Sequence, residues 1–180
     1  MNRNMLRKSM TTLGISAVIG VGLATAGISS WASHAAQSGA QPILQNVINA
    51  DTATTLLKSD AAAFPQPLPV GVSWPNVLPA NLLEKGVVMD PLVPRGVLSL
   101  FWRCAWESSY VKEKDSGNPV GAATSLEKLA SFTTLPFYRE QLIDPQQFWY
   151  TSVVEATRAG DDSNLRNELA QCTYFSGASK

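Results

Sequence analysis

The sequence predicts a mainly α-helical protein: a small domain of four to five helices, with a proline-rich extended arm packed on it and an N-terminal transmembrane or signal helix before it. Three observations carry this prediction. Apolar residues recur at helical spacing between residues 97 and 172. Seven prolines fall between residues 64 and 94. An uncharged, largely apolar run, Thr11–Trp31, follows a basic start.

Residues 1–36 are typical of an export signal. As a helix, the run Thr11–Trp31 would span about 31 Å, close to the roughly 30 Å of a bilayer's hydrocarbon core. Ser33 and Ala35 are small residues that suit cleavage before Ala36. The sequence therefore leaves two outcomes open, a retained signal anchor and a cleaved signal peptide. Both place the rest of the chain outside the cytoplasmic membrane, as a single-pass membrane protein or a secreted one.

Residues 37–63 are predicted to be a linker that contains a short amphipathic helix at most. Apolar or small residues recur there at helical spacing, but the polar face is weak. The residues of this stripe are Ile43, Val47, Ala50, Thr54 and Leu57.

Residues 64–180 are predicted to be the helical extracytoplasmic domain, and residues 64–94 of it form the arm. Its closely spaced prolines remove backbone N–H donors, so the arm is predicted to be extended rather than helical. Trp74 is expected to anchor it on the central helix, because burial of an indole ring is strongly favourable.

The central helix is predicted over Val97–Lys114, the most aromatic stretch of the chain. Pro94 suits its first turn, and Gly117 with Pro119 ends it. One face carries Val97, Phe101, Cys104, Ala105 and Ser108, and an adjoining stripe carries Trp102, Trp106 and Tyr110. Because these two faces together are unusually wide, the helix is expected to be covered on two sides.

Three further segments are predicted to be helical. Residues 121–142 form one or two helices, divided at Pro136. Asp144 and Pro145 signal the start of a helix that runs to Ala159. Its inward positions are predicted to be Phe148, Trp149, Ser152, Val153 and Ala156. A short last helix covers residues 165–172.

The chain has only two cysteines, Cys104 and Cys172. In an exported protein a disulfide between them is the expected state. A redox-active pair is the alternative, but the C-x-x-C spacing that lowers a thiol pKa is missing.

Composition excludes several classes of function. From Ala36 onward there are eleven Lys and Arg residues against fourteen Asp and Glu, a balance that argues against a nucleic-acid partner. The only histidine, His34, precedes the predicted domain, which excludes a Ser-His-Asp triad or a His-ligated metal within it. We predict no cofactor, no metal and no catalytic residue.

Two groups of residues are weighed as sites. Trp74, Trp102, Trp106 and Tyr110 form a candidate binding face for an envelope glycan or peptide, unless the arm itself covers it. Glu107 is expected to form a surface ion pair with Arg103, four residues earlier. A carboxylate-dependent hydrolase would instead need Glu107 and Glu155 to face each other across a cleft.

The function predicted from these observations is that of a non-enzymatic exported or membrane-anchored accessory domain. Its expected partners are the membrane, through Thr11–Trp31 if that run is uncleaved, and an unidentified protein or envelope ligand. The alternatives are a glycan- or peptide-binding module that uses the aromatic face, and a carboxylate-dependent hydrolase.

Overall fold

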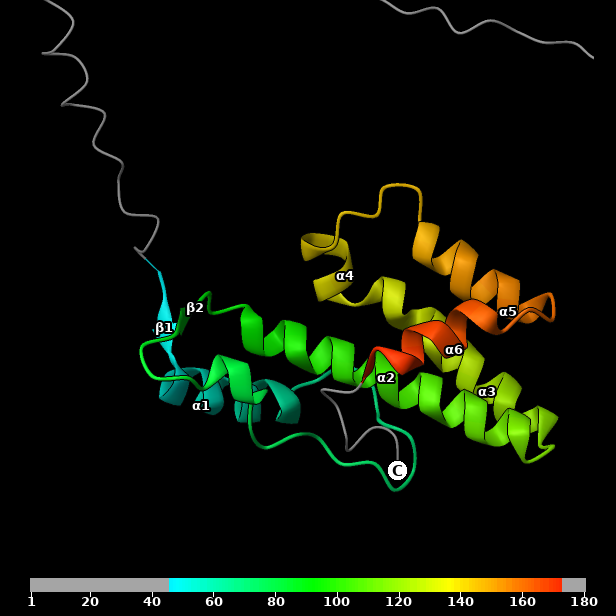
Figure 1. The fold of residues 1–180 in the computed structure, drawn as a ribbon, viewed down its shortest axis with the longest axis horizontal. Helices are drawn as coiled ribbons and strands as arrows, with labels where there is room; N and C mark the ends of the chain where they lie inside the picture. The colour runs from blue at the N-terminus through cyan, green and yellow to red at the C-terminus, as the bar shows by residue number, and fades with distance from the viewer. Residues whose placement is uncertain (1–45, 173–180) are drawn as a thin grey trace, which may run out of the picture. The chain divides into compact units, whose positions relative to one another are not determined.

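The computed structural model describes residues 46–172, all of which belong to one compact unit (Figure 1). This part of the chain is mainly helical, as predicted, with six α-helices and a small two-stranded sheet. The helices are α1 (Ala50–Ala62), α2 (Val93–Asp115), α3 (Pro119–Ala130), α4 (Pro136–Gln141), α5 (Ala156–Arg158) and α6 (Ser163–Ala170).

Shorter elements connect these helices. Two are 3-10 turns, η1 (Ala80–Leu82) and η2 (Ser131–Thr134), and one is a π-helix, η3 (Tyr150–Glu155). Strands β1 (Ile48–Asn49) and β2 (Val88–Met89) pair antiparallel, with Ile48 opposite Met89. None of the described helices combines the length and the apolar character needed to cross a bilayer. The predicted signal or anchor, Thr11–Trp31, lies outside the described residues.

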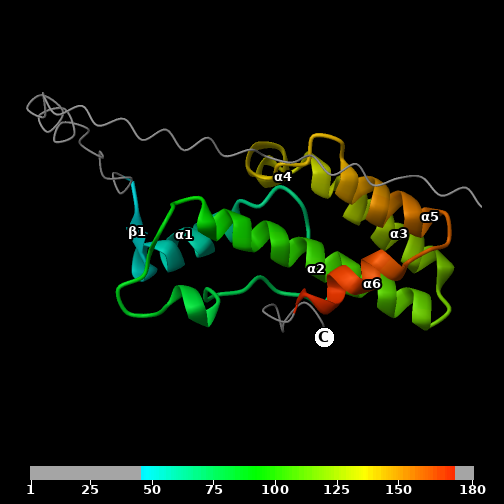
Figure 2. The ribbon, with the colours of Figure 1, turned by 45° about the horizontal axis from the view of Figure 1, so that its top comes forward.

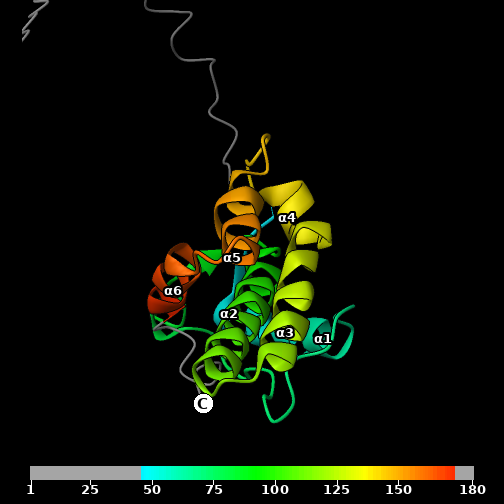
Figure 3. The same cartoon turned by 90° about the vertical axis from the view of Figure 1, so that its right-hand side faces the viewer.

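Helix α2 is the centre of the unit and contacts α1, α3, α4 and α6 (Figure 3). Pro94 lies in its first turn, where a missing N–H leaves no carbonyl unpaired. The helix ends at Asp115, and Gly117 follows with a φ of +75°, a left-handed conformation that glycine adopts without strain. Both ends of the central helix therefore lie close to where the sequence predicts them.

Helix α1 lies in the segment that the sequence describes as a linker, and it packs into the core. Asn49 caps it by accepting a hydrogen bond from the Thr52 N–H at 2.9 Å. Ala53 and Leu57 are fully buried in a cluster with Leu98 of α2. Packing against α2, rather than helix propensity, thus explains why this short segment is helical.

The proline-rich stretch that follows α1 makes direct contacts with α2. The carbonyl oxygen of Pro67 accepts hydrogen bonds from the indole N–H groups of Trp102, at 2.9 Å, and Trp106, at 3.2 Å. The Trp74 ring lies between Phe64 and Phe101, with centroids 4.7 Å and 5.9 Å away. One backbone carbonyl therefore satisfies two indole donors that burial would otherwise leave unpaired.

The segment after α4 departs most from the prediction. Its helix begins at Phe148 rather than Pro145, because Gln147 has a φ of +50° and breaks the chain direction. The π-helical turn then changes which side chains face inward, since its i→i+5 spacing advances the inward face by one residue. Val153 is buried and Trp149 packs on Phe132, as predicted, but Val154 and Thr157 are buried in place of Ser152 and Ala156, and Phe148 is 72 % exposed.

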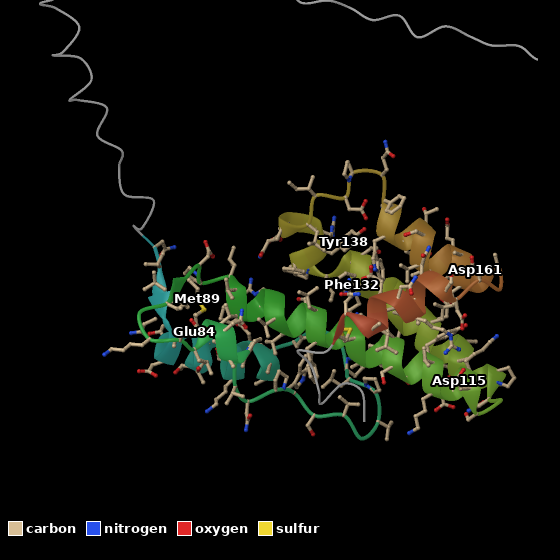
Figure 4. The ribbon with its side chains drawn as sticks, in the orientation of Figure 1. Glu84, Met89, Asp115, Phe132, Tyr138 and Asp161 are labelled. Atoms are coloured by element: carbon tan, nitrogen blue, oxygen red, sulfur yellow. A yellow bond between two sulfur atoms is a disulfide. The ribbon has the colours of Figure 1, made fainter. Side chains whose placement is uncertain are left out.

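Helix α6 is tied to α2 along its length. The Arg166 guanidinium binds both carboxylate oxygens of Asp115 at the end of α2, with the shorter contact 2.7 Å. Nearer the middle of α2, Arg103 Nη1 lies 2.9 Å from Glu168 Oε2. Asp115, the last residue of α2, and Asp161, in the turn before α6, lie at the same end of the unit (Figure 4).

Candidate functional site

Cys104 of α2 and Cys172, just after α6, form a disulfide with an S–S distance of 2.00 Å and a Cα–Cα distance of 5.9 Å. Both residues are buried, in a cluster that also contains Phe101 and Ala105. The structure therefore brings together the two cysteines that the sequence pairs. With a sequence separation of 68, the bond closes a long loop of the chain.

Glu107 is fully buried beside this disulfide. It is paired with Arg103, as predicted, but the prediction that the pair lies on the surface is wrong. Its Oε1 lies 3.4 Å from Arg103 Nε, but neither atom has a well-formed hydrogen bond within the described residues. Arg103 directs its Nη1 to Glu168 instead. Sequence spacing predicted the Arg–Glu pair but not its burial, because the cover comes from the far end of the chain.

Burial of Glu107 favours the neutral form of its carboxyl group. Its Oε2 lies 3.5 Å from the Sγ of Cys172, a disulfide sulfur that has no proton to donate to the carboxyl. Burial raises the pKa of Glu107 to about 8, while the Arg103 charge opposes the rise and the Glu168 charge adds to it. At neutral pH the group is therefore mainly neutral.

The ligand atoms of Cys104, Glu107 and Cys172 all lie within 4.8 Å of one another. Cysteine binds metals as a thiolate, and the disulfide removes both thiolates from the set. In the oxidised protein the cluster thus offers a single carboxyl group and is a structural feature rather than a metal centre.

The aromatic residues of the candidate binding face lie largely in the core. Trp102 is fully buried, Trp106 and Tyr110 are nearly so, and Trp74 is half-buried. Trp102 stacks on Phe132, with centroids 6.5 Å apart. These rings therefore do not form a flat exposed platform for a sugar or a peptide.

A shallow groove of about 310 Å³ does lie next to Trp106. Its walls come from the proline-rich stretch and from α2 and α3, and they include hydroxyl, amide and charged side chains. The polar side chains that line it are Ser108, Ser109, Lys112, Glu113, Asn118, Thr124 and Ser125.

The carboxylates of the hydrolase alternative are not brought together. Glu107 is sealed beneath Cys172, whereas Glu155 is exposed on the π-helical turn. A substrate cannot reach both groups at once, so this pair has no geometry for hydrolysis.

The sequence did not single out the loop of residues 142–148, which projects from the helices between α4 and η3 (Figures 1 and 2). Ile143 is 98 % exposed and Phe148 is 72 % exposed, and Leu142 beside them is also exposed. One short loop thus holds two large apolar side chains in solvent, whereas the other strongly exposed apolar residues, such as Val70 and Val120, lie elsewhere on the domain. The apolar residues on either side of Asp144-Pro145 were the available signal, but the helical pattern assigned Phe148 to the core.

Asp144 fixes the conformation of this loop. Its Oδ1 accepts a hydrogen bond from the Phe148 N–H at 2.7 Å, and its Oδ2 accepts from the Trp149 N–H at 3.0 Å and from the Tyr138 hydroxyl. Tyr138 itself packs edge-on against Phe132, with centroids 5.3 Å apart (Figure 4). The loop is therefore bonded through Asp144 to a buried aromatic cluster.

These bonds shift the titration of both partners. The hydrogen bond from the Tyr138 hydroxyl is the main cause that holds the pKa of Asp144 below its ordinary value; desolvation opposes it, and the Trp149 and Phe148 N–H groups add to the lowering. Burial, together with the bond to Asp144, raises the pKa of Tyr138. The carboxylate thus stays ionised and the hydroxyl stays protonated over the physiological range.

Gln147 completes the loop in the left-handed region, with a φ of +50°. Among the described residues it is the only non-glycine residue with a positive φ. Such conformations are strained for residues with a Cβ and persist where surrounding contacts enforce them. Here the enforcing contacts are those of Asp144 with the next two N–H groups.

In comparisons with known proteins, no protein family, no curated protein and no solved structure matched this chain.

Proposed function

We propose that the chain is a non-enzymatic accessory domain that acts outside the cytoplasmic membrane, held there by Thr11–Trp31 or secreted, and that it makes its contact through the loop of residues 142–148. The observation that carries this proposal is the exposure of Ile143 and Phe148 on a loop that Asp144 holds in one conformation. Exposed apolar patches of this kind are typical of interaction sites.

Two further features support an extracytoplasmic role. The disulfide suits an oxidising compartment, because thiols in the cytoplasm are kept reduced. The proline-rich stretch serves in this proposal as a fixed cover of α2, since Pro67 and Trp74 are committed to contacts within the domain. In this proposal the loop offers its exposed apolar side chains, Ile143 and Phe148, to a partner.

A photoreactive benzoyl-phenylalanine in place of Phe148, in cells that express the full chain, tests the proposal. The matched control places the same amino acid at Val120, which is 75 % exposed on α3. We expect one defined adduct, with lipid or with a single protein, at position 148 and not at position 120. Equal labelling at both positions would show that the loop has no partner.

The groove beside Trp106 supports a second candidate, the binding of an envelope glycan. Its volume of about 310 Å³ lies at the lower end of ligand pockets, and its hydroxyl and amide groups suit sugar hydroxyls. Nuclear magnetic resonance titration of the full chain with soluble peptidoglycan fragments tests it. Shifts confined to the Trp106 indole and its groove neighbours support binding, and unchanged spectra at millimolar fragment reject it.

A further inference from the structure

We infer that the loop of residues 142–148 inserts its exposed apolar side chains into the surface of a lipid bilayer. This inference rests on the proposed function and names the surface that the loop contacts. Leu142, Ile143 and Phe148 supply the apolar material, and the loop stands clear of the helices in Figures 1 and 2. Burying such side chains in the interfacial region of a bilayer is favourable.

The loop carries one charge, and that charge is already hydrogen-bonded within the protein. Asp144 is its only charged residue, and three protein donors already bind that carboxylate. Pro145, Gln146 and Gln147 are uncharged. The three donors partly replace the water that the Asp144 carboxylate would lose on insertion, which lowers the penalty of bringing this charge near the bilayer.

The charges that flank the loop also bear on the kind of membrane. Arg139 and Glu140, at the end of α4, are exposed and opposite in sign, and neither makes an ion pair within the described residues. They add no net charge next to the loop. Contact should therefore depend on apolar burial and only weakly on the fraction of anionic lipid.

The size of the surface favours a bilayer over a protein partner. Stable protein interfaces bury roughly 1,200 Å² or more, and three side chains on one loop are a small part of such an area. A weak contact is sufficient when the chain is already attached to the same membrane, because tethering raises the effective concentration to about the millimolar range.

The sequence sets the length of that tether. Residues 32–47 separate the end of the predicted anchor from β1, and sixteen residues span at most about 55 Å even when fully extended. A domain on so short a connection meets the bilayer repeatedly. Because Asp144 already fixes the loop, little further ordering is needed when it inserts.

The test uses the full chain reconstituted in vesicles, with the photoreactive benzoyl-phenylalanine at position 148 or, as control, at position 120. One set of vesicles is pure phosphatidylcholine and the other contains added phosphatidylglycerol. After irradiation, intact-mass measurement counts lipid adducts. We expect several-fold more lipid adduct at position 148 than at position 120, with similar yields in the two lipid mixtures. Equal yields at the two positions would overturn the inference.

A second variant tests whether Ile143 drives the contact. Ile143→Ser, combined with the photoreactive residue at position 148, should lower the lipid adduct several-fold while the circular dichroism spectrum is unchanged, since Ile143 is exposed. An undiminished yield would contradict insertion of the loop. If position 148 labels a protein in cells and no lipid in vesicles, the proposed function stands and this inference fails; if it labels neither, both fail.

Discussion

Glu107 is the only acidic or basic residue among residues 46–172 that is fully buried, and its environment makes stability depend on pH. Burial raises its folded-state pKa from 4.5 to about 8. A raised folded-state pKa means that the folded protein holds a proton which the unfolded chain releases. The contribution to stability is therefore complete below about pH 4.5 and is lost as the pH rises through about 8.

Glu107→Gln should remove this dependence, because the amide resembles the neutral carboxyl and cannot ionise. We expect the variant to unfold at nearly the wild-type denaturant concentration at pH 5 and to be more stable than wild type at pH 9, by up to about 5 kcal/mol. Urea titrations at the two pH values measure this. Glu140→Gln, on the exposed surface of α4, is the control and should leave the stability unchanged at both pH values. If Glu107→Gln is instead less stable than wild type at pH 9, the ionised pair with Arg103 stabilises the fold.

At the scale of the element, Asp144 is the residue that holds the loop and the start of the following helix. Asp144→Ala removes the acceptor for the Phe148 and Trp149 N–H groups and leaves the Tyr138 hydroxyl unpaired. We expect a lower melting temperature and faster hydrogen exchange at residues 148 and 149, with Glu84→Ala, at an exposed residue before β2, as the control. Because the pKa of Asp144 is lowered, its contribution is present above its ordinary pKa near 3.8 and is lost as the pH falls, so the variant should also lose part of the wild type's acid sensitivity. Unchanged exchange at these two amides would contradict the role of Asp144.

The packing of α2 on α4 requires a glycine. A Cβ added at Gly96 would lie 2.9 Å from the ring of Phe137, which is itself buried. Alanine is the better helix former by about 1 kcal/mol, but overpacking costs about 1–3 kcal/mol, so Gly96→Ala should destabilise the protein by roughly 1 kcal/mol. Chemical denaturation measures the loss. When Phe137 is replaced by leucine, Gly96→Ala should destabilise the protein less than it does beside Phe137. An equal loss of stability with phenylalanine or leucine at position 137 would show that the Phe137 ring is not the source of the strain.

The ends of a helix were predictable from sequence where a single residue dictates the backbone geometry. Pro94 and Gly117 mark the ends of α2, because one has no N–H and the other accepts a left-handed conformation. The buried face of the helix after Asp144 was predictable only in part: Trp149 and Val153 face inward as expected, but periodicity assumes an α-helix and the chain forms a π-helical turn there. The burial of Glu107 was equally hidden, because its cover is Cys172, which is distant in sequence.

At the scale of the whole molecule, the disulfide joins the central helix to the end of the described chain. Cys104→Ser and Cys172→Ser should each lower the free energy of unfolding by about 4 kcal/mol, because the disulfide restricts the unfolded chain to a long closed loop. The double variant should lose no more stability than either single variant. Guanidinium denaturation of the three proteins measures this. A double variant that loses the sum of the two single losses would mean that the cysteines stabilise the fold independently.

We propose that this chain, a helical domain closed by a disulfide, acts outside the cytoplasmic membrane. The most direct test is to denature cells that express the full chain without reductant, alkylate free thiols at once, and measure the intact mass of the purified chain. We predict a chain with no alkylated cysteine that gains two adducts only after reduction. A chain that carries two alkylated cysteines before reduction would contradict the claim.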